Sequence, residues 1–424
     1  MTQPQRPPRT NPSDAALLAI LSLVYGAQYL DQILLGMFIK PIKAEFALSD
    51  TQIGLLTGVA FTALFVILGL PMARLADRGS RKLIVLGCAT IFSLATIFCG
   101  LSVGFLSLFA MRMLVAVGEA GTIPASVSML ADVFPPSKRR LAMSFHSCGA
   151  YFGTSLGLLF IALATDVLSW RHIFAIAGAF GLILALLVAV FVREPKRVGG
   201  AAAPATFMQD LRKLIVIKPF VFLSLALGVM SIATSAAINW VPAFLGRSHG
   251  MSQQQIVLFL AAVWGLGATT GGVISGVVTN RLYRMGGRWP LLVVGCLMIF
   301  YPAMCSVAFL AADASITMIG FGFALFVMGG IRGPSFATVQ DIAPAHCRAT
   351  ANAILMFSMY AIGVSLGPLL TGIISDILNA SFGAESLRYA LLAVIASAGV
   401  LAATLVGLAA LTMKDAVNDE GQPA

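Results

Sequence analysis

The chain has 424 residues, of which 59% are apolar and only 10% are charged, and its formal net charge is +10. About 25% of the residues of a soluble globular protein are charged, so this composition excludes a soluble enzyme, a secreted disulfide scaffold and a nucleic-acid-binding protein. Apolar runs of about twenty residues recur along the chain, and each could cross a bilayer core of about 30 Å. The composition therefore predicts an all-α polytopic membrane protein.

Twelve membrane-spanning helices are predicted from these runs, in two groups of six. The stretch at 193–217 begins with R-E-P-K-R and continues with a Gly-, Ala- and Pro-rich segment, which is typical of a linker. We expect an N-terminal lobe at 15–192 and a C-terminal lobe at 218–412, between a disordered lead at 1–14 and a tail at 413–424. The predicted helices cover residues 15–40, 52–76, 83–104, 105–131, 140–165, 170–192, 218–245, 254–280, 289–311, 315–341, 348–377 and 387–412.

Lysine and arginine concentrate in the loops on one side of the predicted bundle. The basic loops at 74–82, 138–140 and 193–218 all lie on the same side as the two termini. Because cytoplasmic loops carry an excess of Lys and Arg, the pattern predicts a multi-pass protein of the cell (cytoplasmic or inner) membrane with cytoplasmic N- and C-termini. The net positive charge is then explained by topology, and no nucleic-acid partner is expected.

Two short motifs each occur once in the first predicted lobe and once in the second. The motif S-x-x-Q-I occurs at 49–53 and 252–256, and G-x-S-L-G occurs at 153–157 and 363–367. The two pairs have nearly the same offset, which indicates that a six-helix unit was duplicated. Such a parallel duplication, with the substrate near the bilayer midplane between the halves, is typical of major facilitator transporters.

Several segments carry a resemblance to that family. The sequence A-R-L-A-D-R-G-S-R-K at 73–82 resembles the signature loop between helices 2 and 3 of the major facilitator superfamily, and the segments at 42–56, 118–126 and 132–139 resemble its spinster-like branch. The resemblance implies two pseudo-symmetric six-helix lobes and a secondary active transporter that works by alternating access. It also implies a monomer.

Four ionisable residues fall well inside predicted spans, namely Asp31, Arg112, Glu119 and Arg332. Charges within a bilayer are costly and usually functional. They lie on predicted helices 1, 4 and 10, each the first helix of a three-helix unit. Because these helices line the central cavity in the superfamily, the resemblance places the four side chains beside water and substrate.

The first three of these residues form the predicted proton-coupling site. Arg112 and Glu119 lie on one face of a helix, about 10 Å apart along its axis, and Asp31 lies at a depth similar to that of Arg112, so these two can pair. Burial favours a protonated carboxyl, whereas a nearby arginine favours the ionised form. We hypothesise that Asp31, Arg112 and Glu119 form a proton- or conformation-coupled switch. The alternative is a fixed salt-bridge network that holds the two helices together.

Arg332 has no acidic residue within one turn of its own helix. A guanidinium suits a carboxylate or phosphate, so we hypothesise that it binds an anionic head group of the substrate. The alternative is an arginine that donates to backbone carbonyls at a helix break near Gly329, Gly330 and Gly333.

The remaining substrate-binding candidates are Glu119, Asn239, Trp240, Phe357 and Tyr360, which are polar or aromatic in otherwise apolar helices. Asn239 and Trp240 are alternatively explained by packing or by an interfacial belt. A few charges in an apolar cavity fit a small amphiphilic anion, such as a lysophospholipid or a sphingoid-phosphate-like lipid, and the spinster-like resemblance implies the same class. A proton-coupled drug exporter and an organic-acid or sugar transporter of the same fold are the alternatives.

A cytoplasmic gate is predicted from Asp77, Arg78, Arg81 and Arg139. Asp77 opposes the positive bias of its loop, and we expect it to cap a helix N-terminus across the lobe interface and to pair with Arg139 or Arg140. The alternative is topological, because a basic loop is expected at this position in any case.

No enzyme is predicted, because the four histidines are scattered and neither H-E-x-x-H nor a Walker loop occurs. We expect no cofactor and no metal. The six cysteines show no C-x-x-C spacing and are interpreted as reduced packing residues.

Overall fold

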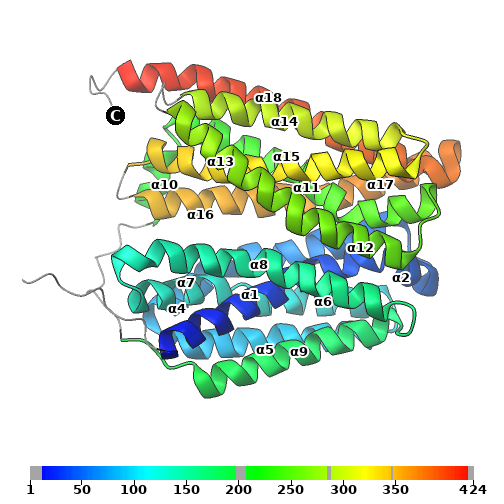
Figure 1. Cartoon of the computed structure of the whole chain (residues 1–424), viewed down its shortest axis with the longest axis horizontal. Coiled ribbons are helices and arrows are strands. Elements are labelled where there is room, and N and C mark those ends of the chain that lie inside the picture. Colours follow the sequence, from blue (N-terminus) through cyan, green and yellow to red (C-terminus); the bar gives the residue numbers. More distant parts are fainter. Residues whose placement is uncertain (1–11, 197–206, 284–287, 345–346, 419–424) are drawn as a thin grey trace, which may run out of the picture.

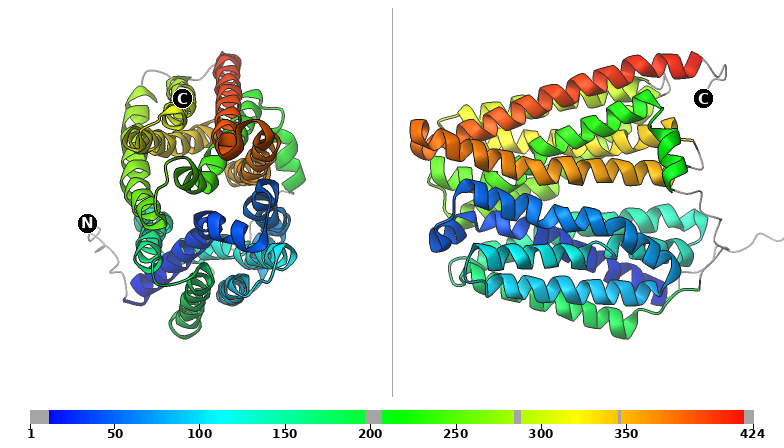
Figure 2. Two further views of the ribbon diagram at one scale, coloured as in Figure 1. Left: turned by 90° about the vertical axis from the view of Figure 1, so that its right-hand side faces the viewer. Right: turned by 180° about the vertical axis from the view of Figure 1, so that it is seen from behind.

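The computed structural model describes residues 12–196, 207–283, 288–344 and 347–418, and this part of the chain is helical with no β-strand. Two bundles lie side by side, the first built from α1–α9 and the second from α11–α18 (Figures 1 and 2). Ten ranges of the described chain are long and apolar enough to cross a membrane. One of these ranges, 350–413, contains two successive spanning helices, and α8 supplies a further one. The prediction of an all-α bundle of twelve spans is therefore confirmed.

The helices of the first lobe agree with the predicted ranges to within a few residues. Two of its spans are interrupted: α3, η1 and α4 follow one another directly, and α6 and α7 are separated by a turn. The short α2 lies between the first two spans and was not predicted. The elements are α1 (Pro12–Met37), α2 (Ile39–Phe46), α3 (Asp50–Gly54), η1 (Leu55–Val59), α4 (Ala60–Arg78), α5 (Arg81–Gly100), α6 (Phe105–Glu119), α7 (Thr122–Val133), α8 (Pro136–Ala164) and α9 (Trp170–Phe191).

The second lobe repeats this arrangement after the linker helix α10. Its second and fifth spans each contain a π-helical segment, η2 and η4. The elements are α10 (Phe207–Leu214), α11 (Lys218–Ser248), α12 (Gln253–Val263), η2 (Trp264–Ala268), α13 (Thr269–Tyr283), α14 (Arg288–Leu310), α15 (Ala314–Ile342), α16 (Arg348–Ser358), η4 (Met359–Val364), α17 (Ser365–Phe382), η5 (Gly383–Glu385) and α18 (Ser386–Asn418).

The repeated S-x-x-Q-I motif is a helix start in both lobes. The Ser49 hydroxyl accepts a hydrogen bond from the Gln52 N–H at 3.1 Å, and the Gln52 side chain accepts one from the Ser49 N–H at 2.9 Å. Ser252 and Gln255 form the same reciprocal pair at 3.2 and 3.0 Å. A capping box satisfies two N–H groups that a helix start leaves unbonded, which explains why the motif occurs at the start of α3 and again at the start of α12.

The repeated G-x-S-L-G motif is a close helix contact in both lobes. A Cβ atom on Gly153 of α8 would lie 2.5 Å from the Cα of Gly26 in α1, and one on Gly363 of η4 would lie 2.0 Å from the Cβ of Ser231 in α11. Small residues allow helices in a bilayer to approach closely. The motif therefore packs the fifth span of each lobe onto its first span.

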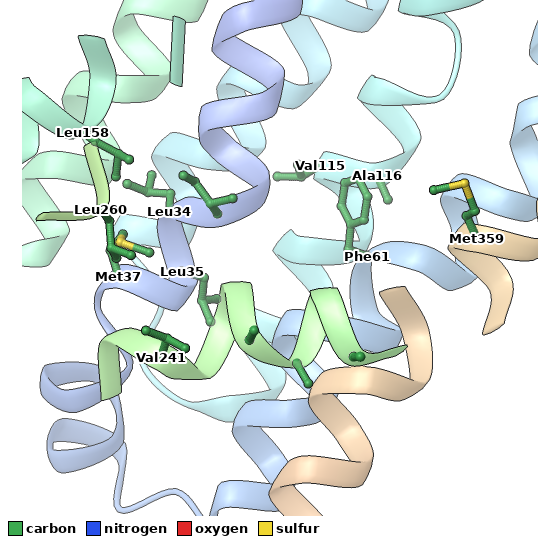
Figure 3. Close-up of a cluster of buried hydrophobic side chains, with 14 of the residues drawn as sticks. Leu34, Leu35, Met37, Phe61, Val115, Ala116, Leu158, Val241, Leu260 and Met359 are labelled. Atoms are coloured by element: carbon green, nitrogen blue, oxygen red, sulfur yellow. The ribbon is translucent and has the colours of Figure 1, made fainter. Parts of the chain in front are cut away.

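A cluster of buried apolar side chains joins the two lobes at their centre (Figure 3). The first lobe contributes residues of α1, α4, α6 and α8, and the second contributes residues of α11, α12 and η4. The charged residues discussed below therefore lie in a largely apolar interior. The labelled side chains are Leu34, Leu35, Met37, Phe61, Val115, Ala116, Leu158, Val241, Leu260 and Met359.

Candidate functional site

A buried ion pair lies at the centre of the first lobe. The Arg112 guanidinium of α6 lies 2.8 Å from the Asp31 carboxylate of α1, and their side chains are 1% and 4% exposed. The other Asp31 oxygen accepts a hydrogen bond from the Thr96 hydroxyl of α5 at 2.5 Å. The Arg112 guanidinium also lies over the Phe61 ring, 5.7 Å from its centroid. The pairing agrees with the depth predicted for both residues, and it fixes three helices of the lobe around one carboxylate.

Glu119 is the second buried acid, and it does not share this ion pair. Its Oε2 accepts a hydrogen bond from the Gln32 amide at 2.8 Å, whereas its Oε1 has no hydrogen-bond partner among the described residues. Gln32 follows Asp31 directly on α1, so one helix contributes both the first acid of the site and the partner of the second. A buried oxygen without a partner is costly, so Oε1 is an unsatisfied acceptor within the site.

A helix break positions Glu119. It is the last residue of α6, and α7 begins at Thr122 with Pro124 as its third residue. Proline has no N–H, so the carbonyl of Ala120 loses its usual helical donor. The chain therefore bends directly after the acid, and polar backbone is left beside it.

Arg332 of α15 reaches across to the first lobe. Its Nη1 lies 3.5 Å from the Tyr29 hydroxyl of α1. The break at Pro334 frees the carbonyl of Gly330, but the Ser275 hydroxyl of α13 donates to that carbonyl at 2.8 Å. The carbonyl freed at the break thus has a donor of its own, and the role of Arg332 in binding an anionic head group stays a prediction. Arg332 lines a small cavity together with Leu227, Met230, Ser231, Thr234, Met328, Ile331 and Met359.

Aromatic side chains extend this region; Tyr360 was predicted from the sequence, whereas Tyr25, Tyr29 and His146 were not. Tyr29 is in edge contact with Tyr25, at 6.3 Å between centroids, and Tyr25 stacks on His146 of α8 at 5.1 Å. His146 is 3% exposed, and neither ring nitrogen has a hydrogen-bond partner among the described residues. Tyr360 of η4 lies against Phe65 of α4, at 4.9 Å between ring centroids. The spacing of Tyr25 and Tyr29, one turn apart on the helix that carries Asp31, was the available signal.

Of three further predicted binding residues, Asn239 and Trp240 are buried and bonded to backbone carbonyls, and Phe357 is exposed. Asn239 is buried and donates to the Ser235 carbonyl of its own helix at 2.9 Å. Trp240 is fully buried and donates to the Pro368 carbonyl at 3.0 Å. Phe357 stands 56% exposed. Asn239 and Trp240 thus take part in packing, which was the alternative weighed for both, and their role in substrate binding stays a prediction.

Of the four residues predicted to form the cytoplasmic gate, the structure describes the side chain of Arg81 alone. The side chains of Asp77, Arg78 and Arg139 lie outside the described residues. Arg81 is 1% exposed and forms ion pairs with Asp132 and Glu194, both in its own lobe or the adjoining linker. In this state Arg81 therefore ties α5 to the end of α7 and to the chain after α9, and its role in a gate stays a prediction.

Glu194 is held by several donors. Burial raises the pKa of its carboxyl, but hydrogen bonds from the Lys82 N–H, the Arg81 guanidinium and the Ser80 hydroxyl outweigh this effect, so the pKa lies below the ordinary value of 4.5. The three bonds measure 2.7, 2.9 and 2.8 Å. A lowered pKa in the folded state means that the ionised carboxyl stabilises the fold at neutral pH and that this contribution is lost as the pH falls through the folded-state pKa.

The variant Glu194→Gln should therefore melt a few degrees lower than the wild type at pH 7. The difference between the two proteins should shrink once the pH drops below the folded-state pKa, because Glu194 is then neutral in the wild type too. Thermal unfolding of the detergent-purified protein at pH 7 and at a series of lower pH values measures both effects. Glu385→Gln, which removes an ion pair within one turn of the second lobe, is the matched control. A deficit that persists unchanged at the lower pH would contradict the assignment.

A second cavity, which is apolar, lies between the two lobes. It is bounded by α1 and α8 of the first lobe and by four spans of the second, and its wall contains almost no polar atoms. The cavity has a volume of about 30 Å³, and its apolar wall offers a sugar almost no hydrogen-bond partners. The lining residues are Ile33, Met37, Leu158, Ala237, Ile238, Val241, Leu260, Trp264, Tyr301, Cys305, Phe321, Ala324 and Leu325.

Comparison with known proteins identifies the family to which this fold belongs. A model of the Major Facilitator Superfamily matches residues 21–368, which is most of the chain. The chain belongs to this superfamily. Members of the superfamily are membrane transporters rather than enzymes, so the protein is a multi-pass membrane transporter with a fold built for alternating access.

Similar proteins within the superfamily indicate the branch to which the chain is related. The chain is 29% identical over 408 residues to a protein of Mycolicibacterium smegmatis named "MFS-type efflux pump", with 96% of this chain and 95% of that protein covered. It is 28% identical to "Sphingosine-1-phosphate transporter SPNS2" of Danio rerio, with 88% and 79% covered. A crystal structure of a bacterial homologue of the human lysosomal transporter Spinster, in an inward-facing and unoccupied conformation, superposes with a TM-score of 0.84 at 26% identity and covers 96% and 99% of the two chains. The chain is thus a spinster-like member of the superfamily.

Proposed function

We propose that this protein is a proton-coupled secondary transporter that moves an amphiphilic anion, of the lysophospholipid or sphingoid-phosphate class, across the cytoplasmic membrane of the cell. One observation carries the proposal: two buried acids and Arg112 lie in the first lobe, and Arg332 of the second lobe lies 3.5 Å from Tyr29, on the helix that carries Asp31. The excess of basic residues on the side of the termini supports cytoplasmic N- and C-termini.

Proton coupling is supported by the unequal environments of the two acids. Asp31 has an arginine and a hydroxyl as partners, whereas Glu119 has one neutral amide. A buried carboxyl without a cation at hydrogen-bonding distance favours its protonated form. In the proposed cycle, Glu119 takes up a proton when the cavity faces one side and releases it on the other. Movement of Arg112 between Asp31 and Glu119 links that proton to the conformation of the lobe.

The substrate class is supported by what surrounds Arg332. A guanidinium forms strong charge-assisted hydrogen bonds with phosphate and carboxylate oxygens, and the Tyr29 hydroxyl at 3.5 Å adds a polar group beside it. The apolar lining of the cavity between the lobes suits a hydrocarbon chain, which would have to widen the cavity in order to enter it. That one relative is named a sphingosine-1-phosphate transporter supports the same class for this chain.

A proton-coupled drug exporter is the second candidate, because another relative is named an efflux pump. The two candidates differ in the charge of the substrate. A cationic drug would interact with Glu119 and avoid Arg332, whereas an anionic lipid requires Arg332. An organic-acid or sugar transporter would also need Arg332 or further polar groups but would leave the apolar cavity empty.

Ligand-induced thermal stabilisation of the purified protein tests the substrate class. Lysophospholipids, sphingoid phosphates, organic acids and cationic drugs are compared on the wild type, on Arg332→Met and Arg332→Lys, and on the control Arg212→Met in the exposed face of α10. We expect an anionic lipid to stabilise the wild type and the control. Loss of a charged hydrogen bond costs about 1.5–3 kcal/mol, so Arg332→Met should bind it roughly 10- to 150-fold more weakly, with Arg332→Lys between. Stabilisation by cationic drugs alone, unaffected by Arg332→Met, would overturn the proposal.

A further inference from the structure

Two carboxylates reach across the lobe interface in opposite directions, at the end of the bundle away from the termini. Asp50 is the first residue of α3 in the first lobe, and Asp376 lies in α17 of the second lobe. Figure 1 shows α2 and the far end of α17 together at this end, opposite the linker helix α10. We refer to Lys43, Asp50, Arg247 and Asp376 as the distal charge cluster.

Asp50 is bound chiefly by the opposite lobe. The Arg247 guanidinium of α11 donates to both of its carboxylate oxygens, each at 2.8 Å, and the Ser375 hydroxyl of α17 donates at 2.7 Å. Lys43 of α2, in the same lobe as Asp50, forms a further ion pair with it. Asp50 is only 3% exposed. A bidentate arginine–carboxylate pair of this kind is strong and geometrically specific.

Asp376 makes the reciprocal contact. Its carboxylate accepts from the backbone N–H groups of Asp50 and Thr51 at 3.0 and 2.7 Å, and from the Thr51 hydroxyl at 2.6 Å. A carboxylate at this position bonds the free N–H groups of a helix start and complements its dipole. The second lobe therefore caps the continuous helix that begins at α3 in the first lobe.

The backbones of the two lobes are closely packed at this contact. A Cβ atom on Gly54 would lie 2.5 Å from the Pro368 carbonyl oxygen, one on Gly58 would lie 2.5 Å from the Ser365 carbonyl oxygen, and one on Gly372 would lie 2.2 Å from the Asp50 carbonyl oxygen. The second span of the first lobe and the fifth span of the second are thus in backbone contact over several turns. Alternating access requires these two helices to separate, and the distal charge cluster must then come apart.

The distribution of charge within the cluster shows how that separation can occur. The first lobe contributes one cation and one anion, Lys43 and Asp50, and the second lobe also contributes one of each, Arg247 and Asp376. Among the ion pairs of the described chain, none joins Arg247 to Asp376, although both side chains contact Asp50 or its backbone. Within each lobe, therefore, the cation and the anion of the cluster can pair with each other, in addition to the contacts that they make across the interface in the closed state.

We infer that the distal charge cluster is a gate that opens by exchange of ion-pair partners: Asp50 keeps Lys43, and Arg247 moves from Asp50 to Asp376. No charge is left without a partner in either state, so the gate can be strong when closed and still open readily. The inference uses the alternating-access fold alone, and it is independent of the substrate and of proton coupling.

Distances between the lobes measure the gate directly. Spin labels are placed at Val103 and Ala312, which are exposed at the distal ends of the two lobes, after the exposed Cys148 and Cys296 are replaced by serine. Pulsed electron paramagnetic resonance then gives the populations of distally closed and open molecules in detergent. Asp50→Asn should raise the ratio of open to closed molecules at least tenfold. The control Glu45→Gln breaks an ion pair with Arg171 at the same end but within one lobe, and it should leave the ratio unchanged.

A charge exchange separates partner exchange from a simple lock. The double variant Asp50→Arg/Arg247→Asp keeps a pair across the interface, but it leaves two cations in the first lobe and two anions in the second. Partner exchange predicts that the open population falls below that of the wild type and that transport slows, because neither lobe can pair its own charges. A wild-type distance distribution and transport rate in the double variant would overturn the inference, as would an Asp50→Asn distribution equal to that of Glu45→Gln.

Discussion

Replacement of Arg112 by methionine is expected to abolish transport and to reduce severely the yield of folded protein. The variant leaves the Asp31 carboxylate, at 4% side-chain exposure, without its cation. Removal of one partner from a buried ion pair costs about 3–5 kcal/mol, because an uncompensated charge remains in a medium of low dielectric constant. This is comparable to a large part of the net stability of a typical domain, about 5–15 kcal/mol. Thermal unfolding and substrate uptake in proteoliposomes measure the two losses.

The double variant Asp31→Asn/Arg112→Met distinguishes an ion pair that acts as a switch from one that only braces two helices. Because both charges are removed together, no buried charge is left alone, and folding should recover to near the wild-type melting temperature. Transport should stay lost if Arg112 is the moving element of a switch. Recovery of both folding and transport would show instead that the pair is a static brace between α1 and α6, which is the alternative the sequence left open.

Replacement of Glu119 by glutamine is expected to uncouple transport from protons while leaving the protein folded. Glutamine keeps the shape of the side chain, and its amide can bond the Gln32 side chain in the place of Oε2. Accumulation of substrate driven by a pH gradient should fall at least tenfold, whereas exchange of external for internal substrate should continue, since exchange needs no net proton transfer. The distal Glu45→Gln is the control and should leave both activities intact. Equal accumulation by Glu119→Gln and the wild type would contradict the assignment of Glu119.

The spans were predictable because each membrane crossing imposes a length and an apolar composition that the sequence records directly. The lobe repeat was readable for a similar reason, since its motifs encode local structures: S-x-x-Q-I forms capping boxes and G-x-S-L-G forms close helix contacts. The pairing of Asp31 with Arg112 followed from their similar depth. The short helix α2 was missed because it is amphipathic and too short to give a hydropathy signal.

Contacts between distant parts of the chain could not be read in this way. Gln32 and Glu119 are 87 residues apart, and Tyr29 and Arg332 are 303 residues apart. Their contacts depend on the rotation of each helix about its axis, which packing against neighbouring helices decides. The same limit applies to Asp376, an acid near a helix end whose contact with α3 is visible only once the lobes are assembled.

The central claim is that substrate movement carries protons through Glu119, and proton flux driven by substrate tests it most directly. Proteoliposomes containing a pH-sensitive dye are given the anionic lipid that stabilises the purified protein, with no imposed pH gradient. We expect the internal pH to change in wild-type vesicles, at a rate that follows substrate transport, and to stay constant in Glu119→Gln vesicles. Substrate transport by the wild type without a change in internal pH, or an equal change in both proteins, would contradict the account.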